Sequence, residues 1–373
     1  MKMKRREFIG GAAMSVAAIA SGRAGTIGGV TAPRAKIGDI RAMYLGLGHN
    51  MWCDWPSAAM GTLEEGAAKL ERPPDLALTC NDEIWRKATD HMAENGVNMI
   101  VVDLGEGLVY PSHPELAIRG SWTPEKMRNE ISRLWTRGIE VVPKLNFSTT
   151  HNAWLGDYSH AVSSRLYYRV CEDVIRDCCE IFDSPRFFHI GFDEEYCEHQ
   201  EKNDRYKYIC VRRGEMWWGD FLHIVGAIEK NGARPWAWSD FGWHNKEYFK
   251  RCPRSVVQQN WYYDECYGGF DLATNKTDDS CRLKEFTELE EAGFDQVPCG
   301  TNWVGWRRGQ LGIGADDVMG KLVRYARTVI SKEHLYGFMM APWRHPTDHA
   351  ALEFLNSGTD ILAAALSHEE ESE

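Results

Sequence analysis

Three consecutive carboxylates, Asp193, Glu194 and Glu195, directly follow an aromatic and aliphatic run at 186–192. The run predicts a buried strand. Acids at its tip add nothing to stability, because removing an unpaired carboxylate from water costs free energy. Adjacent carboxylates push their pKa values apart, so one can hold a proton near neutral pH while the other is ionised. The pattern indicates acid–base chemistry at a strand end; the plainer interpretation is that Asp193 caps a following helix.

Short apolar runs of this kind recur along the chain, separated by segments of helical periodicity. They lie at 42–47, 97–104, 139–146, 187–192, 234–239, 256–261, 296–301 and 335–342. Their continuous apolar character fits parallel strands buried on both faces. Several preceding helical segments end in glycine, the expected C-cap, as at Gly96, Gly138 and Gly293. Eight such units, without a Gly-rich dinucleotide fingerprint, predict an α/β fold, a (β/α)8 TIM barrel.

The N-terminus has the layout of an export signal. Arg5 and Arg6 precede a short apolar run at 10–20, which predicts a twin-arginine signal over residues 1–24. The run is too short to cross a bilayer, and no membrane span is expected in the mature chain. We expect a linker at 25–41, a single barrel domain at 42–366 and an acidic tail at 367–373. The protein is expected to be exported to the periplasm or the extracellular space.

Composition narrows the choice of partner. The net charge of −11 argues against nucleic acid. The 11 cysteines are odd in number and lack a framework spacing, so we expect mostly free, buried thiols. The 15 Trp, 14 Tyr and 14 Phe suit either a sugar-binding cleft or a large core. The sequence predicts no cofactor and no metal, and it leaves the oligomeric state open.

In a barrel of this type the active site lies at the carboxyl ends of the strands. The residues that follow the predicted strands are therefore expected to gather there. Carboxylates and tryptophans dominate among them, with almost no lysine, which suits a neutral polyhydroxyl ligand; a phosphorylated one would require basic groups. A carbohydrate substrate is predicted. The candidate site residues are Asp103, His151, Asp193, Glu194, Trp238, Asp240, Trp261, Asn302, Trp303 and Trp343.

These motifs resemble glycoside hydrolase family 20, the β-N-acetylhexosaminidases. The segment 189–194, His-Ile-Gly-Phe-Asp-Glu, resembles the family's His-x-Gly-Gly-Asp-Glu. The segments 103–125 and 138–143 follow in the family's order, and the similarity covers about residues 96–345. The positions of the family's tryptophans are matched by Trp238, Trp261 and Trp343.

The resemblance implies a substrate-assisted, retaining cleavage. Glu194 would act as general acid and base, and Asp193 would orient the substrate's own acetamido group. That group attacks the anomeric carbon in place of an enzyme nucleophile, a recognised exception to the two-carboxylate scheme. The three tryptophans would wall the acetamido pocket.

Four positions depart from the family pattern. Phe192 replaces the second Gly of the strand-4 motif, and His49-Asn50 stands where strand 1 carries an Arg. The segment 301–303, Thr-Asn-Trp, replaces a Tyr-Leu-Asp whose Tyr holds the acetamido carbonyl, although its Asn302 is able to donate a similar hydrogen bond. The segment 343–345, Trp-Arg-His, replaces Trp-x-Glu. Because sites that hydrogen-bond a ligand discriminate strongly, we expect a changed sugar specificity.

Three other interpretations stay open. A retaining or inverting glycosidase for a non-acetylated sugar would use Asp240 or Asp103 as its second carboxylate; a carboxyl separation of about 5–5.5 Å suits retention and about 6.5–9.5 Å suits inversion. A carbohydrate-binding barrel without catalysis is a second possibility, given the changed sugar contacts. A metal site is the third, with the candidates His345, His349, Cys197 and His199.

Overall fold

The computed structural model of the chain describes residues 24–195, 210–263, 278–303 and 315–367. The predicted export signal, apart from its last residue, lies outside the described residues. So do the acidic tail from residue 368 onward and the metal candidates Cys197 and His199.

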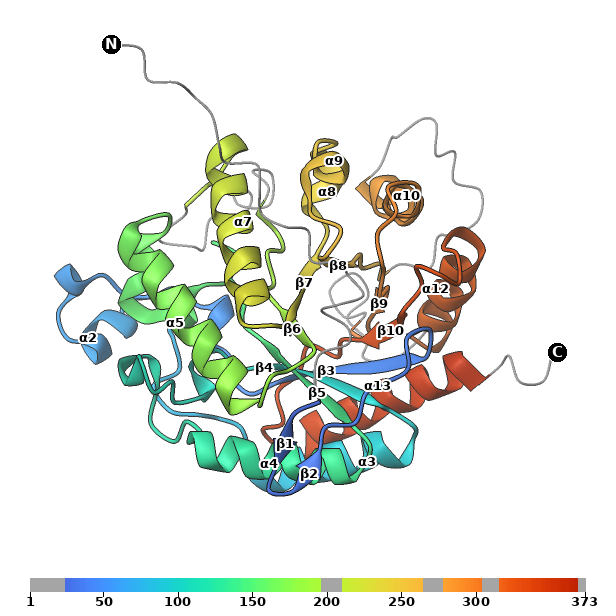
Figure 1. Cartoon of the computed structure of the whole chain (residues 1–373). Helices are drawn as coiled ribbons and strands as arrows, with labels where there is room; N and C mark the ends of the chain where they lie inside the picture. Colours follow the sequence, from blue (N-terminus) through green and yellow to red (C-terminus); the bar gives the residue numbers. More distant parts are fainter. Residues whose placement is uncertain (1–23, 196–209, 264–277, 304–314, 368–373) are drawn as a thin grey trace, which may run out of the picture.

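One parallel sheet of eight strands forms the centre of the described structure, in the order β8-β7-β6-β5-β4-β3-β10-β9 (Figure 1). Bridges from Gln258 to Gln296 and from Trp261 to Cys299 join the two ends of this order, so the sheet closes. The predicted TIM barrel is confirmed. The strands are β3 (Ile40–Gly46), β4 (Met99–Asp103), β5 (Glu140–Lys144), β6 (Phe187–His189), β7 (Arg234–Trp238), β8 (Val257–Gln259), β9 (Cys299–Gly300) and β10 (Gly337–Met340).

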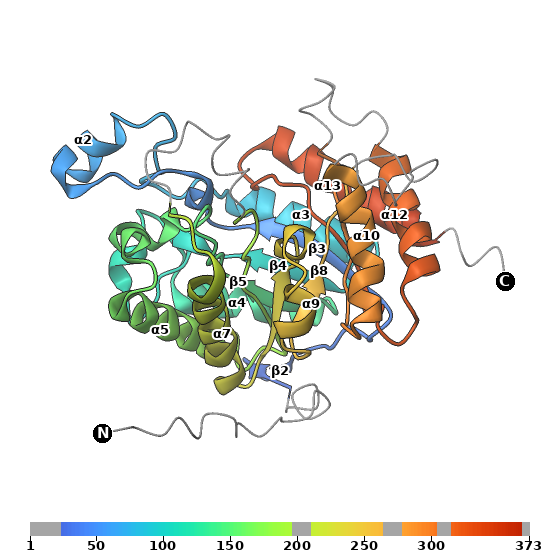
Figure 2. The same cartoon turned by 90° about the horizontal axis from the view of Figure 1, so that it is seen from above.

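Helices surround the barrel, and each predicted apolar run overlaps one of its strands (Figures 1 and 2). The connection from β7 to β8 carries two single-turn helices in place of one long helix. The helices are α2 (Leu63–Ala67), α3 (Asp82–Glu94), α4 (Pro124–Thr136), α5 (Arg165–Ile181), α7 (Gly214–Lys230), α8 (Phe241–His244), α9 (Tyr248–Arg251), α10 (Asp278–Glu291), α12 (Ala315–Val329) and α13 (His349–Ser367).

The sequence sets the helix ends locally. At the start of α4, the Thr123 side chain accepts a hydrogen bond from the Lys126 amide, and proline occupies the first helical position. Beyond α3 and α4, Gly96 and Gly138 adopt φ values of 80° and 78°, the left-handed conformation in which helices commonly end. Both glycines were predicted as caps. These sharp ends allow each helix to return directly to the foot of the next strand.

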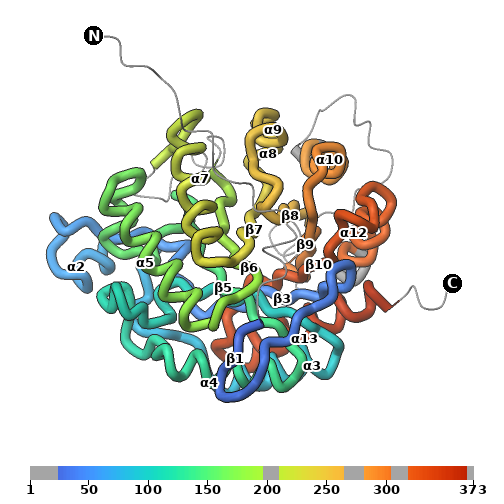
Figure 3. Tube along the Cα trace, in the orientation of Figure 1, coloured from blue at the N-terminus to red at the C-terminus, as the bar shows by residue number. Residues whose placement is uncertain are grey.

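The segment expected to be a linker, 25–41, carries a small hairpin. Its strands β1 (Thr26–Ile27) and β2 (Val30–Thr31) pair across Gly28-Gly29 and contact α4 at the foot of the barrel (Figure 3). The Ala35 amide donates to Glu140 at the start of β5. The barrel itself begins at Ile40, two residues before the predicted boundary at 42.

The sequence also predicted that the mature chain has no membrane span and that its cysteines are mostly free and buried. Within the described residues, no helix combines the length and apolar character required to cross a bilayer. The cysteines in the described ranges are all free, and most of them are buried. They therefore act as small apolar side chains in the packing between helices and sheet.

Candidate active site

The chain leaves β6 through an unusual backbone path. Phe192 and Glu194 have φ values of 71° and 58°, which cost non-glycine residues on the order of 1–3 kcal/mol each. Gly191, with φ of 69°, is also left-handed, and a Cβ there would collide with the Asn146 side chain. A third left-handed non-glycine residue, Trp343, follows β10 with φ of 53°. Strain of this kind gathers at functional sites.

Side chains from neighbouring strands hold this path in place. The hydroxyl of Ser148, beyond β5, donates to the Asp193 carbonyl at 2.6 Å, and Thr150 Oγ1 does so at 3.2 Å. The Glu194 amide donates to Asp240 Oδ2, beyond β7, at 2.7 Å. Strand ends on both sides of β6 therefore fix where the two acids point.

Phe192, the bulky departure from the family motif, does not obstruct the acids. Its side chain is buried against α7, edge-on to Trp217 and Phe221 at centroid distances of 5.7 and 5.2 Å. Its aromatic ring therefore serves the packing between barrel and helix.

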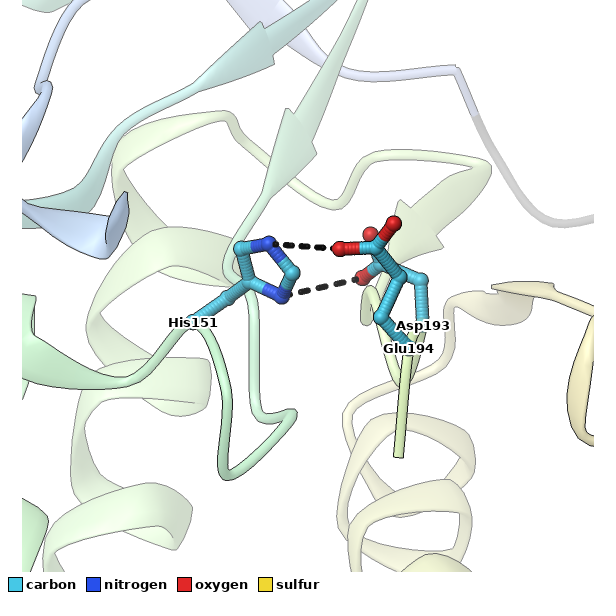
Figure 4. A group of neighbouring side chains, drawn as sticks. All are labelled: His151, Asp193 and Glu194. Atoms are coloured by element: carbon cyan, nitrogen blue, oxygen red, sulfur yellow. Dashed lines mark ion pairs between the residues drawn. The ribbon is translucent and has the colours of Figure 1, made fainter. Parts of the chain in front are cut away.

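His151, Asp193 and Glu194 meet at the barrel mouth (Figure 4). His151 Nδ1 lies 3.9 Å from Asp193 Oδ1, and His151 Nε2 lies 3.5 Å from Glu194 Oε2. Asn146 Nδ2 donates to Asp193 Oδ1 at 2.8 Å. The exposed fraction is 14% for the Asp193 side chain and 26% for that of Glu194. Glu194 is thus the acid more open to a ligand.

The two acids have opposite electrostatic surroundings. Burial alone would raise the pKa of Asp193, but the neighbouring His151 and Lys144 and the hydrogen bond from Asn146 hold it below its ordinary value. Burial, followed by the charges of Asp193 and Asp240, raises the pKa of Glu194 to about 8. At neutral pH the pair therefore consists of an ionised Asp193 and a protonated Glu194. This is the division of roles that general acid catalysis requires.

Asp240 is a third, fully buried acid beside this pair. Burial and the charge of Asp193 raise its pKa. Its Oδ2 accepts the Glu194 amide, while its Oδ1 has no hydrogen-bond partner in the described structure. A protonated Asp240 would be able to donate a hydrogen bond from this second oxygen to an acceptor.

Aromatic rings line the same end of the barrel. Trp343 lies 5.8 Å from Trp238 and 4.7 Å from Tyr44 between ring centroids. Trp343 Nε1 donates to Tyr263 at 3.3 Å, and Tyr263 stacks on Trp261 at 4.9 Å. Trp343, Trp261 and Tyr263 are partly exposed, whereas Trp238 is buried. The predicted tryptophans after β7, β8 and β10 therefore belong to one continuous wall.

Comparisons with known proteins bear on the fold. No family model matches the chain, and no curated protein does. Among solved structures, a β-N-acetylhexosaminidase from Bacteroides fragilis superposes with a TM-score of 0.52 at 12% identity, over 88% of this chain and 66% of that one. A glycoside hydrolase family 20 exo-β-N-acetylglucosaminidase from Vibrio harveyi gives 0.51 at 14% identity, over 90% and 57%. Dispersin B gives 0.50 at 14%, over 78% and 95%.

The likeness is one of fold. At these identities it establishes a shared barrel architecture and does not by itself transfer an activity. This chain spans between about half and two thirds of the length of the first two structures.

Two predicted substrate-binding side chains are held by other parts of the protein. Asp103, at the end of β4, is buried and ion-paired with Lys144, its register neighbour on β5. Asn302 Nδ2 donates to the Phe354 carbonyl at 2.9 Å, so the amide proposed to replace the family's tyrosine is directed to α13. These contacts tie both side chains into the scaffold. The next residue, Trp303, is partly exposed, and its backbone amide donates to Thr301 Oγ1 at 2.9 Å.

Two residues at positions that depart from the family motif, His49 after β3 and His345 after β10, contact each other. His49 Nδ1 lies 3.0 Å from His345 Nδ1, and His345 Nε2 donates to the Gly48 carbonyl at 2.7 Å. Burial lowers the pKa of His345 to about 3, so its ring is neutral. Glu106 lies beneath them and accepts the amides of His49 and Asn50. Burial raises the pKa of Glu106 to about 7.

Metal coordination has one candidate group in the described ranges. One ligand atom each from His151, Asp193 and Glu194 can be chosen so that all lie within 4.8 Å of one another. The predicted histidine pair does not form such a group, because His345 contacts His49 and Gly48 while His349 is exposed at the start of α13. A metal in the described structure would therefore compete with the proton on Glu194.

Several contributors to the site were not among the predicted residues. Asn146 and Lys144 set the charge state of Asp193, and Tyr44 and Tyr263 complete the aromatic wall. Asn146 and Tyr263 lie beyond strand ends, a signal that was present in the sequence. Lys144 and Tyr44 lie within strands, where only the sheet register shows that they reach Asp103.

Proposed function

We propose that the protein is a glycoside hydrolase whose general acid and base is Glu194. The observation that carries this proposal is the pairing of a partly exposed, protonated Glu194 with an ionised Asp193, beside a wall of tryptophans. Glycosidic cleavage needs a proton for the leaving oxygen and anionic support for an oxocarbenium-like transition state. The solved structures that share the barrel fold include β-N-acetylhexosaminidases, which supports the same class of reaction.

We further propose the substrate-assisted route for a 2-acetamido sugar. Glu194 donates its proton to the glycosidic oxygen while the acetamido carbonyl oxygen forms a bond to the anomeric carbon, so the glycosidic bond breaks and the leaving group departs as an alcohol. Asp193 accepts a hydrogen bond from the acetamido N–H and stabilises its developing positive charge. Water then attacks the anomeric carbon, the bond to the acetamido oxygen breaks, Glu194 takes up the water's proton, and the configuration is retained.

The immediate succession of the two acids favours this route over an enzyme nucleophile. The other carboxylates offered by the sequence are poorly suited to attack: Asp103 is ion-paired with Lys144, and Asp240 is buried with a raised pKa. A nucleophile needs an ionised, accessible oxygen. A non-catalytic carbohydrate-binding barrel remains the outcome to exclude by experiment.

The test is turnover of aryl β-glycosides of GlcNAc, GalNAc, glucose and galactose. Glu194→Gln should lower kcat on the cleaved substrate by about 10²–10⁴-fold. The loss should be smaller with 2,4-dinitrophenyl than with methylumbelliferyl leaving groups, because the better leaving group needs less protonation. Glu83→Gln, an exposed acid on α3, serves as the control. Near-normal turnover by Glu194→Gln would exclude its role.

The variant Asp193→Asn distinguishes the substrate-assisted route from a route that uses an enzyme nucleophile. It should reduce cleavage of N-acetylated substrates most, since its proposed partner is the acetamido group. An equal loss on plain glucosides would remove the substrate-assisted mechanism and leave a glycosidase of another kind. Sugar binding without any turnover in the wild type would indicate a binding protein.

A further inference from the structure

Arg282, on α10, has an unusual environment for a partly buried arginine. Its guanidinium carbon lies 4.5 Å from the Trp243 ring centroid and 4.4 Å from that of Trp261. Among the side chains that the structure describes, its guanidinium has no ion pair with a carboxylate, and its Nε is buried without a hydrogen-bond partner. The aromatic rings stabilise its position, but they give this Nε–H no acceptor.

Other buried arginines of the chain are matched. Arg212 contacts Glu195 and Asp220, Arg234 contacts Asp295, and Arg186 contacts Glu140. A guanidinium taken fully out of water needs an anion, and in these three cases the protein supplies a carboxylate. Arg282 is partly buried and lies against two aromatic rings, so its charge is available to an anion that enters from solvent.

The position of Arg282 places that anion at the mouth of the barrel. Trp261 follows β8 and stacks on Tyr263, which is hydrogen-bonded to Trp343. In Figure 1, α10 stands beside the short helices α8 and α9, and it contacts α8. The charge of Arg282 lowers the pKa of both Glu194 and Asp240. The guanidinium thus borders the site that holds the proposed general acid.

The charge balance of the site favours an anionic ligand. With Glu194 and Asp240 protonated, Asp193 is the ionised member of the acid cluster. Arg282 and Arg72 both act on Glu194 with positive charge. An acidic group can therefore approach without facing three carboxylates. A guanidinium suits carboxylate and sulfate oxygens in particular, because its N–H groups form a planar fork.

We propose that Arg282 and Trp261 form a subsite for a negatively charged substituent, either the carboxylate of a uronic acid or a sulfate ester, on the sugar chain that the protein binds. This proposal rests on the proposed function for its carbohydrate ligand. It names the substrate class as acidic glycans. Trp261 would stack on the sugar ring while Arg282 donates hydrogen bonds to the charged group.

Matched pairs of methylumbelliferyl substrates test the subsite. One pair is the β-glucuronide and the β-glucoside; the other is 6-sulfo-β-GlcNAc and β-GlcNAc. The wild type should prefer the charged member of at least one pair. Arg282→Gln should lower kcat/KM on that member by about 10–100-fold, the range for losing a hydrogen bond between charged groups, with little change on the neutral member. Arg282→Lys should recover part of the loss, because it keeps the charge without the fork.

The control is Arg251→Gln. Arg251 also lies over a tryptophan, Trp218 at 4.6 Å, but is paired with Glu215 on the outer face of the barrel. It should leave the preference unchanged. Equal losses on charged and neutral substrates in Arg282→Gln, or a wild-type preference for the neutral member of both pairs, would overturn the subsite. Circular dichroism checks that each variant is folded.

Direct binding measurements distinguish a failure of catalysis from a failure of the subsite. If the wild type cleaves none of these four substrates and none of the aryl glycosides that test the proposed function, that function fails, and saturation-transfer NMR with the methyl glycosides of the same four sugars then decides the subsite. Binding of a charged sugar in preference to its neutral partner, lost in Arg282→Gln, supports it. Binding without preference, or no binding of any of them, overturns it.

Discussion

Two clusters of acids share the tip of β6 and have opposite characters. Glu195 contacts Arg212 through both carboxylate oxygens and also accepts the Thr149 amide, and Arg212 continues to Asp220. One residue earlier, Glu194 lies 3.5 Å from His151, and burial together with the charges of Asp193 and Asp240 raises its pKa. The adjacent acids therefore differ in the charges that dominate their surroundings, a guanidinium for Glu195 and carboxylates for Glu194. An acid bound to a guanidinium stabilises the scaffold, whereas an acid with a raised pKa retains a proton that it can transfer.

The cluster of Glu195, Arg212 and Asp220 also holds the segment that carries Asp193 and Glu194. Arg212 donates to the Phe147 carbonyl, beyond β5, and Glu195 accepts the amide of Thr149 in the same loop. The loop continues to Ser148 and Thr150, whose hydroxyls bond the Asp193 carbonyl. The contribution of Arg212 to the site is therefore positional.

The largest expected effect is on stability and comes from breaking the cluster of Glu195, Arg212 and Asp220. Arg212→Met leaves Glu195 and Asp220 buried without their cation, so it should lower the free energy of unfolding by about 3–5 kcal/mol. Urea denaturation measures it. Arg251→Met, which removes an exposed pair with Glu215, should cost only about 0–1 kcal/mol. If Arg212→Met fails to fold, Arg212→Lys should show an intermediate loss; similar stabilities for the two Met variants would contradict the distinction between clusters.

The second prediction concerns the pH profile. Activity should fall as the pH rises through about 8, because Glu194 loses the proton that it must donate. Asp193→Asn removes a neighbouring negative charge, so the basic limb of its residual activity should move to lower pH, by about one unit, or about 1.4 kcal/mol. Arg282→Gln removes a positive charge, so it should move the basic limb to higher pH. Profiles of kcat/KM between pH 5 and 10 test both, and limbs that do not move would exclude the charge coupling.

The smallest effect is a gain in stability. Asp240 has a raised pKa in the folded protein, so the stability linked to its protonated form is present below the unfolded pKa and is lost as the pH rises through the folded value. Asp240→Asn cannot ionise and keeps an acceptor for the Glu194 amide. We expect a higher free energy of unfolding at pH 9, by roughly 1 kcal/mol or less and visible as a higher Tm, and little change at pH 4. A lower Tm of Asp240→Asn at pH 9 would instead show that Asp240 stabilises the fold.

The strands and the acid pair could be predicted from the sequence because both are local patterns. Parallel strands buried on two faces read as continuous apolar runs, and Asp193 and Glu194 interrupt one of them abruptly. The hairpin at 26–31 was missed because its strands are two residues long, although Gly28-Gly29 is a known turn signal.

The charge state of each acid depends on partners distant in sequence. Glu195 and Glu194 look alike until Arg212 is placed against one of them, 17 residues further along the chain. Asp103 was expected to face the ligand, and only the register of β4 against β5 brings Lys144 to it. The chemistry of the site therefore follows from side-chain pairing across strands, which periodicity does not encode.

The position of the hairpin determines how this barrel can be attached to other structures. The hairpin lies against α4 and the segment after it is bonded at the start of β5, whereas the acids lie beyond the carboxyl ends of the strands. The described chain therefore begins at the end of the barrel opposite its mouth. A fusion partner or solid support joined on this side would leave the barrel mouth, with its cluster of acids, directed outward and accessible even to long polymers.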